Sequence, residues 1–592
     1  MFMNNLVKYD PLLFKFPKGT IAKGKKVTFK IKVDDSLSPN QVLFMIKEDA
    51  DSDYSYTEMT KNEDGYEIDV NFDNAGHFWY NFKLIFNNYT VFLSKTFDNY
   101  SYISDYKGED FLQLVSEKEY TCTSSMQGGL IYQIFVDRFC KVGKVTSREP
   151  LILREDWGGG IQKNTTDPLV INREVFGGNF KGLISKLNYL EELGVTTIYL
   201  NPIGMANSNH KYDTSDYMRV DPMFGTEKEF KELIDKAKEK GMQIVFDGVY
   251  NHTGSDSIYF NRYGRFDTLG AYKSQKSKFY NWYDFQEYPD VYYSWWGIDT
   301  LPRIKENCTD FHDYIAGENG VLDKFLKLGV AGVRLDVVDE ISDEFTEKIS
   351  NRVKKYGDNK VVMGEVWEDA ATKISYSRRR KYFVNNELNS VMNYPVKESI
   401  LSFINTKEPT DLVNTFRMLL NNYPKVVMDN LMNFLGTHDT DRIFWHLKNT
   451  ANGDVKLASK FMKIASLLTY TLPGVPSIFY GDEYGMDNND GSSRGCFDWK
   501  NYKNDIYAWY KKLAGIRKLA VMKDGEFNIL YAKQGKFVFE RISETERVVV
   551  LVNMKPSPLA VNLEGNYVSY FSGKKAKSFK LKEYEVEVLI QK

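Results

Sequence analysis

From about residue 129 to residue 480 the sequence alternates between short apolar runs and longer amphipathic segments. Helical periodicity fills most of the gaps, and Thr226 with Glu229 forms a capping box before one apolar stripe. Repeated strand–helix alternation predicts a parallel sheet, and this many repeats favours a closed (β/α)₈ barrel. The runs that predict strands are residues 131–136, 195–200, 244–246, 333–336, 361–365, 431–435 and 477–480.

The regions on either side of the barrel follow a different pattern. At 592 residues the chain is too long for one core. Residues 1–110 show the two-residue alternation of strands and predict an N-terminal β-sandwich, with a linker at 111–128. The barrel is expected at 129–516, with an insertion rich in Tyr and Trp at about 252–315. Residues 517–592 predict a C-terminal all-β sandwich. The fold class is therefore α/β with flanking all-β domains.

Composition and charge exclude several classes of protein. A net charge of -2 gives no basic surface for nucleic acid. The longest uncharged stretch, between Lys463 and Asp482, contains Pro473, Gly474 and Pro476, so no membrane span is expected. No secretory signal is visible, which predicts a cytoplasmic protein. The four cysteines are scattered and do not predict a disulfide framework: Cys122, Cys140, Cys308 and Cys496.

Acidic and basic side chains stand where several predicted strands end. Carboxyl ends of barrel strands meet at one face, so carboxylates distant in sequence are expected to gather there. Retaining glycoside cleavage needs two such carboxyl groups, a nucleophile and an acid. A single residue of this kind is more often a helix cap or an ion-pair member, but four clusters together predict a site. The residues are Asp247, His252, Arg334, Asp336, Glu365, His438 and Asp439.

Arg334 and Asp336 are two residues apart on one predicted strand. Their side chains are therefore expected on the same side of the strand, where the guanidinium would keep the carboxylate ionised. His252 and His438 are expected to donate hydrogen bonds to sugar hydroxyls.

The same segments resemble a known family. Residues 247–252, 332–340, 364–367 and 434–439 look like the four signature regions of the α-amylase family, in the family's order. The similarity extends to residues 131–139, 212–217, 472–476 and 480–483, and covers about residues 128–515. The resemblance implies a retaining α-glucan hydrolase with a domain B insertion in its barrel.

The resemblance also implies roles for individual residues. Asp336 would be the nucleophile, Glu365 the general acid/base, and Asp439 the carboxylate that holds the distorted sugar. The implied substrate contacts are Tyr212, Asp247, His252, Arg334, Trp367, His438 and Arg442.

Within the family, residues 301–304 after Trp295 and Trp296 resemble the region that marks neopullulanases, cyclomaltodextrinases and maltogenic amylases. The N-terminal β-domain agrees with this subgroup and would bind carbohydrate or serve only in packing. The subgroup implies cleavage of α-1,4 bonds in maltooligosaccharides, cyclodextrins, pullulan or starch. It also implies a homodimer.

No cofactor is expected for the chemistry. The subgroup usually has a calcium-binding loop rich in Asn and Asp after the position of Phe139, but residues 140–144 here read Cys-Lys-Val-Gly-Lys. Asn251 matches a structural calcium ligand of many amylases and is the one candidate metal ligand. Glu340 lies in the region where typical α-amylases have a Lys-His pair. The calcium site that would include Asn251, and the substrate contacts of that pair, therefore differ here as well.

Three alternatives compete with this interpretation. A metal-dependent barrel hydrolase is disfavoured, since the six histidines include no HxH pair. A non-catalytic carbohydrate-binding relative is disfavoured because all three carboxylates are present. Transglycosylation or α-1,6 cleavage by the same site stays open, because water access and acceptor-site shape depend on loops in three dimensions.

Overall fold

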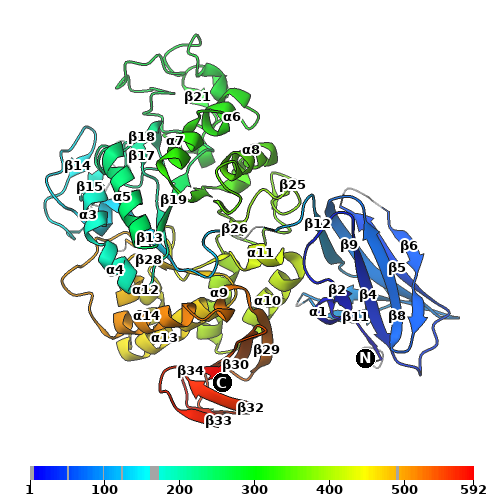
Figure 1. Cartoon of the computed structure of the whole chain (residues 1–592). Helices are drawn as coiled ribbons and strands as arrows, with labels where there is room; N and C mark the ends of the chain where they lie inside the picture. Colours follow the sequence, from blue (N-terminus) through cyan, green and yellow to red (C-terminus); the bar gives the residue numbers. More distant parts are fainter. Residues whose placement is uncertain (1–5, 50–52, 98, 122–123, 161–171, 489–491) are drawn as a thin grey trace. The chain divides into compact units, whose positions relative to one another are not determined.

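The structure is a computed structural model that describes residues 6–49, 53–97, 99–121, 124–160, 172–488 and 492–592 (Figure 1). The chain separates into two compact units. One unit contains the N-terminal region together with Glu368–Leu388 and Thr410–Met428. The other contains the remainder of the barrel sequence and the C-terminal region. Each unit is described by itself.

A parallel eight-stranded barrel forms the centre of the larger unit. The strand order is β26-β23-β22-β19-β16-β13-β28-β27, and a parallel bridge between Met392 and Met432 joins its two ends. The predicted barrel is confirmed. In chain order the strands are β13 (Ile131–Ile134), β16 (Thr197–Leu200), β19 (Gln243–Gly248), β22 (Gly332–Leu335), β23 (Val361–Gly364), β26 (Ser390–Val391), β27 (Met432–Asn433) and β28 (Val475–Phe479).

Seven of these strands correspond to predicted apolar runs, whereas β26 was not predicted. Only two residues of β26 join the ladder, through pairs of Met363 with Ser390 and Gly364 with Val391. A two-residue strand has too little sequence to show a period. The strands are buried on both faces, as parallel strands are, which explains their continuous apolar runs.

Helices connect most successive strands. In α5 (Glu227–Glu239) the predicted capping box is present, because Thr226 accepts the Glu229 N–H and Glu229 accepts the Thr226 N–H. The helical segment predicted near residues 180–190 forms α3 (Phe180–Ser185) and α4 (Leu187–Glu192). Other helices of this unit are α7 (Val321–Leu328), α8 (Asp343–Lys354), α9 (Tyr394–Thr406), α12 (Ile443–Thr450), α13 (Val455–Thr471) and α14 (Asp505–Arg517).

The insertion between β19 and α6 (Thr309–Ala316) is mostly irregular. It contains η2 (Tyr280–Trp282), a hairpin of β20 (Phe285–Glu287) and β21 (Val291–Tyr292), and η3 (Trp295–Gly297). Several of its aromatic rings pack on one another and form its core; the rings of Tyr259 and Trp282, for example, are 5.1 Å apart. A bridge between His252 and Arg303 brings the end of the insertion back beside the strand from which it leaves.

The N-terminal region is a two-sheet β-sandwich. One sheet includes β4 (Lys25–Val33) and β8 (Gly65–Phe72), the other β5 (Gln41–Glu48) and β9 (Gly76–Ile85), and residues from both sheets share one apolar core. The segment predicted as a linker, 111–128, begins with β12 (Phe111–Ser116), which pairs with β9 and belongs to the sandwich.

Two later segments of the chain pack within this same unit. They carry α10 (Thr410–Asn422) and α11 (Lys425–Met428). His77 Nε2 lies 2.8 Å from the Ala371 carbonyl oxygen, and Arg379 binds both oxygens of Asp49 at 3.0 and 2.9 Å. The sandwich is therefore completed by residues from the middle of the sequence.

The C-terminal region is all-β, as predicted. Its six antiparallel strands form one sheet in the order β29 (Glu526–Lys533), β30 (Lys536–Ile542), β31 (Arg547–Asn553), β34 (Glu585–Gln591), β32 (Leu559–Ser569) and β33 (Lys575–Leu581). Within the described ranges no helix is long and apolar enough to cross a membrane. Cys140, Cys308 and Cys496 are free thiols, and Cys122 lies outside the described residues.

Candidate active site

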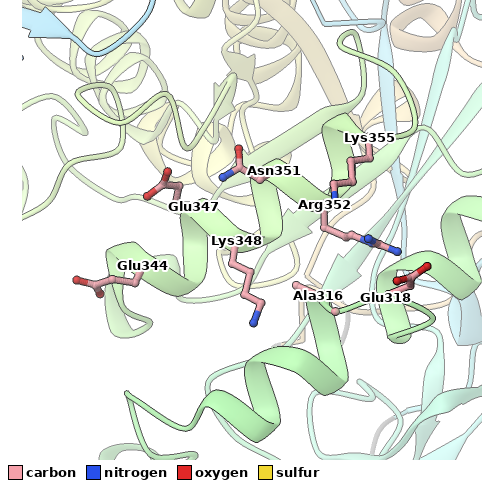
Figure 2. Close-up of a pocket in the computed structure, with 9 residues that line it drawn as sticks. Ala316, Glu318, Glu344, Glu347, Lys348, Asn351, Arg352 and Lys355 are labelled. Carbon is pink, nitrogen blue, oxygen red and sulfur yellow. The ribbon is translucent and has the colours of Figure 1, made fainter.

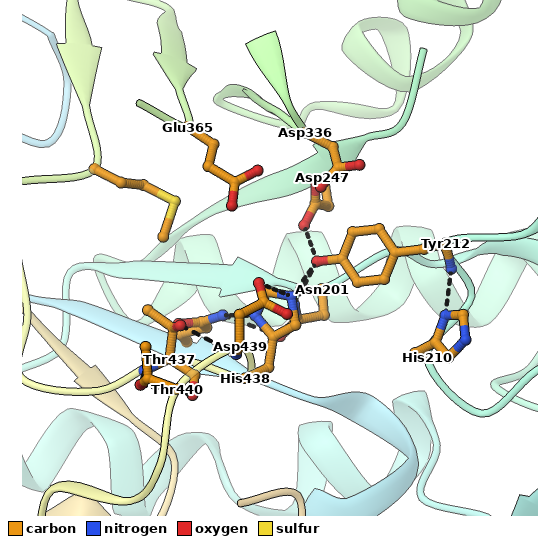
Figure 3. A network of polar contacts seen from close by, with 12 residues as sticks. Asn201, His210, Tyr212, Asp247, Asp336, Glu365, Thr437, His438, Asp439 and Thr440 are labelled. Atoms are coloured by element: carbon orange, nitrogen blue, oxygen red, sulfur yellow. Dashed lines mark hydrogen bonds and ion pairs between the residues drawn. The ribbon is translucent and has the colours of Figure 1, made fainter. Parts of the chain in front are cut away.

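The carboxyl ends of the barrel strands bring the predicted carboxylates together. Asp247 is the penultimate residue of β19, Asp336 directly follows β22, and Glu365 directly follows β23. In Figure 3 these three side chains point toward one another, and Asp439 approaches from the loop after β27. Parallel register places them at one level, since Asp247 pairs with Arg334 and Leu335 pairs with Gly364.

A single buried guanidinium contacts three of these carboxylates. Arg334 Nη1 lies 2.8 Å from Asp247 Oδ1 and 2.9 Å from Asp336 Oδ1, and Nη2 lies 2.8 Å from Glu365 Oε2. Arg334 is completely buried. A planar guanidinium suits this arrangement, because its nitrogens can engage several carboxylates at fixed geometry. The predicted proximity of Arg334 and Asp336 is confirmed.

Burial and neighbouring charges shift the pKa of Asp336 in opposite directions. Burial raises the pKa of Asp336 well above its ordinary value, and the neighbouring carboxylates Glu365 and Asp247 raise it further. The guanidinium of Arg334 acts in the opposite direction and lowers the pKa. Arg334 is thus the cation that opposes burial and the neighbouring carboxylates at Asp336.

Asp247 is held by two tyrosines in addition to Arg334. Tyr199 and Tyr212 both donate their hydroxyl hydrogens to Asp247 Oδ2, each at 2.8 Å. The Tyr212 ring is stacked on the His438 ring, with centroids 5.2 Å apart and planes 4° apart. The predicted substrate residues Tyr212, Asp247 and His438 thus meet beside the carboxylates (Figure 3).

Asp439 lies between a histidine and an arginine. His438 Nε2 is 2.9 Å from Asp439 Oδ2, and Arg494 Nη2 is 3.2 Å from Asp439 Oδ1. Burial would raise the pKa of Asp439, but His438 and Arg494 outweigh it and bring the pKa below its ordinary value. Gln133 Nε2 lies 3.0 Å from His438 Nδ1 and fixes the other edge of that ring.

His252 reaches the site from the end of the β19 segment. Burial lowers the pKa of its ring to about 4, so the ring is neutral at pH 7. Within the described part of the chain its Nε2 atom is buried and has no hydrogen-bond partner. Trp295 packs beside it, with ring centroids 5.5 Å apart. An unsatisfied buried ring nitrogen is suited to binding a ligand hydroxyl.

Trp367 provides an exposed aromatic surface next to Glu365. Its side chain is 48% exposed and stacks on Tyr394, with ring centroids 4.0 Å apart. Its indole N–H donates to Glu365 Oε1 at 3.2 Å. A flat exposed ring beside a carboxyl group is suited to stacking against a sugar, and the substrate contact of Trp367 stays a prediction.

Arg442 is the predicted substrate residue that the structure does not bring into this group. Its buried guanidinium donates to the backbone oxygens of Tyr480 and Ser493 and lies 3.2 Å from Asp482 Oδ1. These contacts tie the start of α12 to the segment after β28. A supporting structural role fits them better than contact with a substrate.

Asn251, the candidate metal ligand, lies beside the carboxylate of Glu340. Asn251 Nδ2 donates weakly to Glu340 Oε2 at 3.5 Å, and Trp296 Nε1 donates to Glu340 Oε1 at 2.7 Å. Both oxygens of Glu340 thus accept an N–H group, and the calcium site at Asn251 stays a prediction. Among the described residues no group of three or more His, Cys, Asp or Glu side chains could hold a metal ion.

A separate groove of about 440 Å³ lies between the end of α6 and the outer side of α8 (Figure 2). Its lining mixes Glu318, Glu344 and Glu347 with Lys348 and Arg352. Lys348 and Arg352 are paired with Asp313 and Asp323. The groove shares no residue with the carboxylate group and has the composition of a solvated helix surface.

Several residues of the site were not predicted from the sequence. Arg494 binds Asp439 from a loop 55 positions later, and no local pattern marks it. Gln133, Tyr199 and Asn201 lie on or directly after β13 and β16, where polar side chains inside apolar strands were a usable signal. Tyr394 supports Trp367 from the start of α9.

Several known proteins are similar to this chain in sequence or fold. A profile described as "Alpha amylase, catalytic domain" matches residues 133–506. The chain is 32% identical over 620 residues to an amylopullulanase of Thermoanaerobacterium saccharolyticum, covering 91% of this chain but 47% of that protein. The chain thus spans less than half the length of that relative. It is 31% identical to a cyclomaltodextrinase of Thermoanaerobacter pseudethanolicus, covering 72% of this chain and 70% of that protein.

A solved structure of a cyclomaltodextrinase has the same fold, with a TM-score of 0.71 at 23% identity over the full length of both chains. The barrel and its group of carboxylates define an enzyme of glycosidase type. This chain belongs to the α-amylase family of glycoside hydrolases.

Proposed function

We propose that this chain is a retaining α-glucan hydrolase that cleaves α-1,4-glucosidic bonds through a covalent glycosyl-enzyme intermediate. The observation that carries the proposal is the contact of one guanidinium, that of Arg334, with both Asp336 and Glu365. Carboxyl groups held on one guanidinium are close together. A retaining enzyme needs this closeness, whereas an inverting enzyme separates its carboxyls to admit a water molecule.

Asp336 attacks the anomeric carbon of the bound sugar and forms the glycosyl–oxygen bond. Glu365 gives its proton to the leaving oxygen and then, as a carboxylate, takes a proton from the water that releases the sugar. Asp439 and His438 hold hydroxyls of the distorted ring, and Tyr212 lies beneath it. The neutral ring of His252 supplies a further hydrogen bond at the same subsite.

The relatives' names support an α-glucan substrate. Amylopullulanase and cyclomaltodextrinase are named for starch, pullulan and cyclodextrins, which share α-1,4-linked glucose. We propose maltooligosaccharides, cyclodextrins, pullulan or starch as substrates. Cleavage of α-1,6 bonds and glycosyl transfer to a sugar are the alternatives for the same carboxylates.

Product analysis on starch, pullulan, β-cyclodextrin and maltotriose tests the proposal. Wild-type protein should release α-configured products, which nuclear magnetic resonance detects before mutarotation. Asp336→Asn and Glu365→Gln should each lose nearly all turnover and keep the wild-type circular dichroism spectrum. Near-normal activity of either variant would remove the assigned roles. Binding without cleavage by the wild type would favour a carbohydrate-binding protein, and longer products from maltotriose would indicate transfer.

A further inference from the structure

Val337, the residue directly after Asp336, has an unusual backbone conformation. Its φ and ψ are 39° and 50°, in the left-handed region. A β-branched residue is a steric outlier there, because Cβ approaches the carbonyl oxygen. Such a conformation persists only where surrounding contacts hold it in place. Because Val337 is adjacent to Asp336, its backbone conformation can orient a group close to the reacting carboxylate.

The left-handed turn redirects the Val337 N–H group. Leu335 pairs with Gly364, and the Glu365 N–H donates to the Leu335 carbonyl. A continued parallel ladder would send the Val337 N–H to the backbone carbonyl of Glu365. Instead, this N–H donates to Oε2 of the Glu365 side chain at 2.9 Å.

The turn after Val337 keeps this arrangement in place. The Glu340 N–H donates to the Val337 carbonyl at 2.8 Å, which closes η4 (Val338–Glu340). Val338 is completely buried and anchors the turn. The left-handed residue is thus fixed from both sides, by Asp336 at the end of β22 and by this buried turn.

The two oxygens of Glu365 have different surroundings as a result. Oε2 accepts the Val337 N–H and lies 2.8 Å from Arg334 Nη2. Oε1 has the Trp367 indole N–H at 3.2 Å. A proton on Oε2 would face a cation and compete with a well-formed hydrogen bond, so the acidic proton is favoured on Oε1.

We propose that Val337 is a positioning residue whose backbone N–H orients Glu365 and assigns the acidic proton to Oε1. This proposal rests on the proposed function. In the first step an Asp336 oxygen forms a bond to the anomeric carbon while the bond to the leaving oxygen breaks. The proton on Glu365 Oε1 moves to that leaving oxygen, and Glu365 is left as a carboxylate held at Oε2.

The test removes the Val337 N–H donor and keeps the side chain. Replacing Val337 by its α-hydroxy acid, through nonsense suppression in the full chain, converts one amide to an ester and keeps the side chain. The matched control is the same change at Ile341, whose N–H donates to the Val338 carbonyl in the same turn. The readout is kcat/KM on maltotriose and on 2,4-dinitrophenyl α-maltoside, whose leaving group needs no proton.

The Val337 ester should lower kcat/KM about tenfold on maltotriose and leave it within about twofold on the aryl maltoside. The Ile341 ester should match the wild type on both substrates. An equal fall on both substrates, no fall on maltotriose, or the same selective fall in the Ile341 ester would overturn the proposal. A wild-type protein that cleaves neither substrate would instead contradict the proposed function.

Val337→Gly separates the N–H from the side chain. Glycine adopts a positive φ without strain and keeps the donor, so this variant should retain kcat/KM within about threefold on both substrates. A selective loss on maltotriose in Val337→Gly, together with wild-type behaviour of the ester, would show that the side chain matters and would refute the role of the N–H.

Discussion

Arg334 and Asp336 stand two residues apart at the end of β22, and Arg334 Nη1 lies 2.9 Å from Asp336 Oδ1. The same guanidinium also contacts Asp247 and Glu365. One fully buried cation therefore faces three carboxylates, and the ionisation of the proposed nucleophile depends on it.

The pH dependence of activity should report this relationship. The nucleophile acts as a carboxylate, and burial with its acidic neighbours raises its pKa, so activity should fall on the acid side at a higher pH than for an exposed aspartate. Arg334→Met removes the group that lowers this pKa, so the acid limb of kcat/KM should move to higher pH. Arg334→Lys keeps a positive charge and should move it less. Coincident acid limbs in the two variants would contradict the assignment.

Arg494 should contribute to substrate binding through Asp439. Its Nη2 lies 3.2 Å from Asp439 Oδ1, and its Nε donates to the His438 carbonyl at 2.8 Å. Arg494→Met should lower kcat/KM on maltotriose about tenfold, since a charge-assisted contact is lost, while the melting temperature changes little. Arg494→Lys should recover part of the loss. Unchanged kinetics in Arg494→Met would show that the contact is dispensable.

Removal of divalent metal ions should have no effect. The Glu340 oxygens beside Asn251 accept N–H groups. Where the subgroup has its calcium loop, Lys141 Nζ lies 3.9 Å from Glu155 Oε2, so a side-chain cation is already present. Dialysis against EDTA should leave the melting temperature and kcat/KM unchanged. A fall in either that calcium chloride reverses would reveal a metal site.

Gly332, the first residue of β22, should tolerate no side chain. A Cβ atom there would lie 2.1 Å from the carbonyl oxygen of Val361 on the neighbouring strand. Gly332→Ala should lower the free energy of unfolding by about 1–3 kcal/mol or more, measured by urea denaturation, because the two strands must separate. Gly204→Ala is the matched control, since its Cβ would meet ordinary contacts at 3.7 Å and beyond. Equal stability of both variants would contradict the steric argument.

The sequence was sufficient for the barrel and for most of the site because both depend on local signals. Apolar runs mark buried strands, and charged residues at their ends, such as Asp336 and Glu365, mark the face where strands converge. The strand β26 escaped prediction because two residues show no period. The resemblance implied a substrate contact for Arg442, yet its side chain turns toward Asp482.

Other features depend on tertiary structure and have no sequence signature. Arg494 reaches Asp439 only because a distant loop folds over the strand ends. The left-handed backbone of Val337 runs against the preference of a β-branched residue, so any local rule predicts the opposite conformation. Aromatic residues of the insertion, such as Tyr259 and Trp282, form part of the insertion's own core. Composition alone cannot distinguish such core aromatic residues from those that bind sugar.

The grouping of Glu368–Leu388 and Thr410–Met428 with the N-terminal sandwich affects how this protein can be dissected. A shortened gene that starts after residue 123 would delete His77 and Asp49, the residues that contact Ala371 and Arg379 in the intact chain. Those later segments would then expose surfaces that the sandwich covers when both are present. Chimeric proteins that exchange only the sandwich with a relative at this boundary should therefore be poorly soluble. Exchange of both later segments together with the sandwich should avoid this loss of solubility.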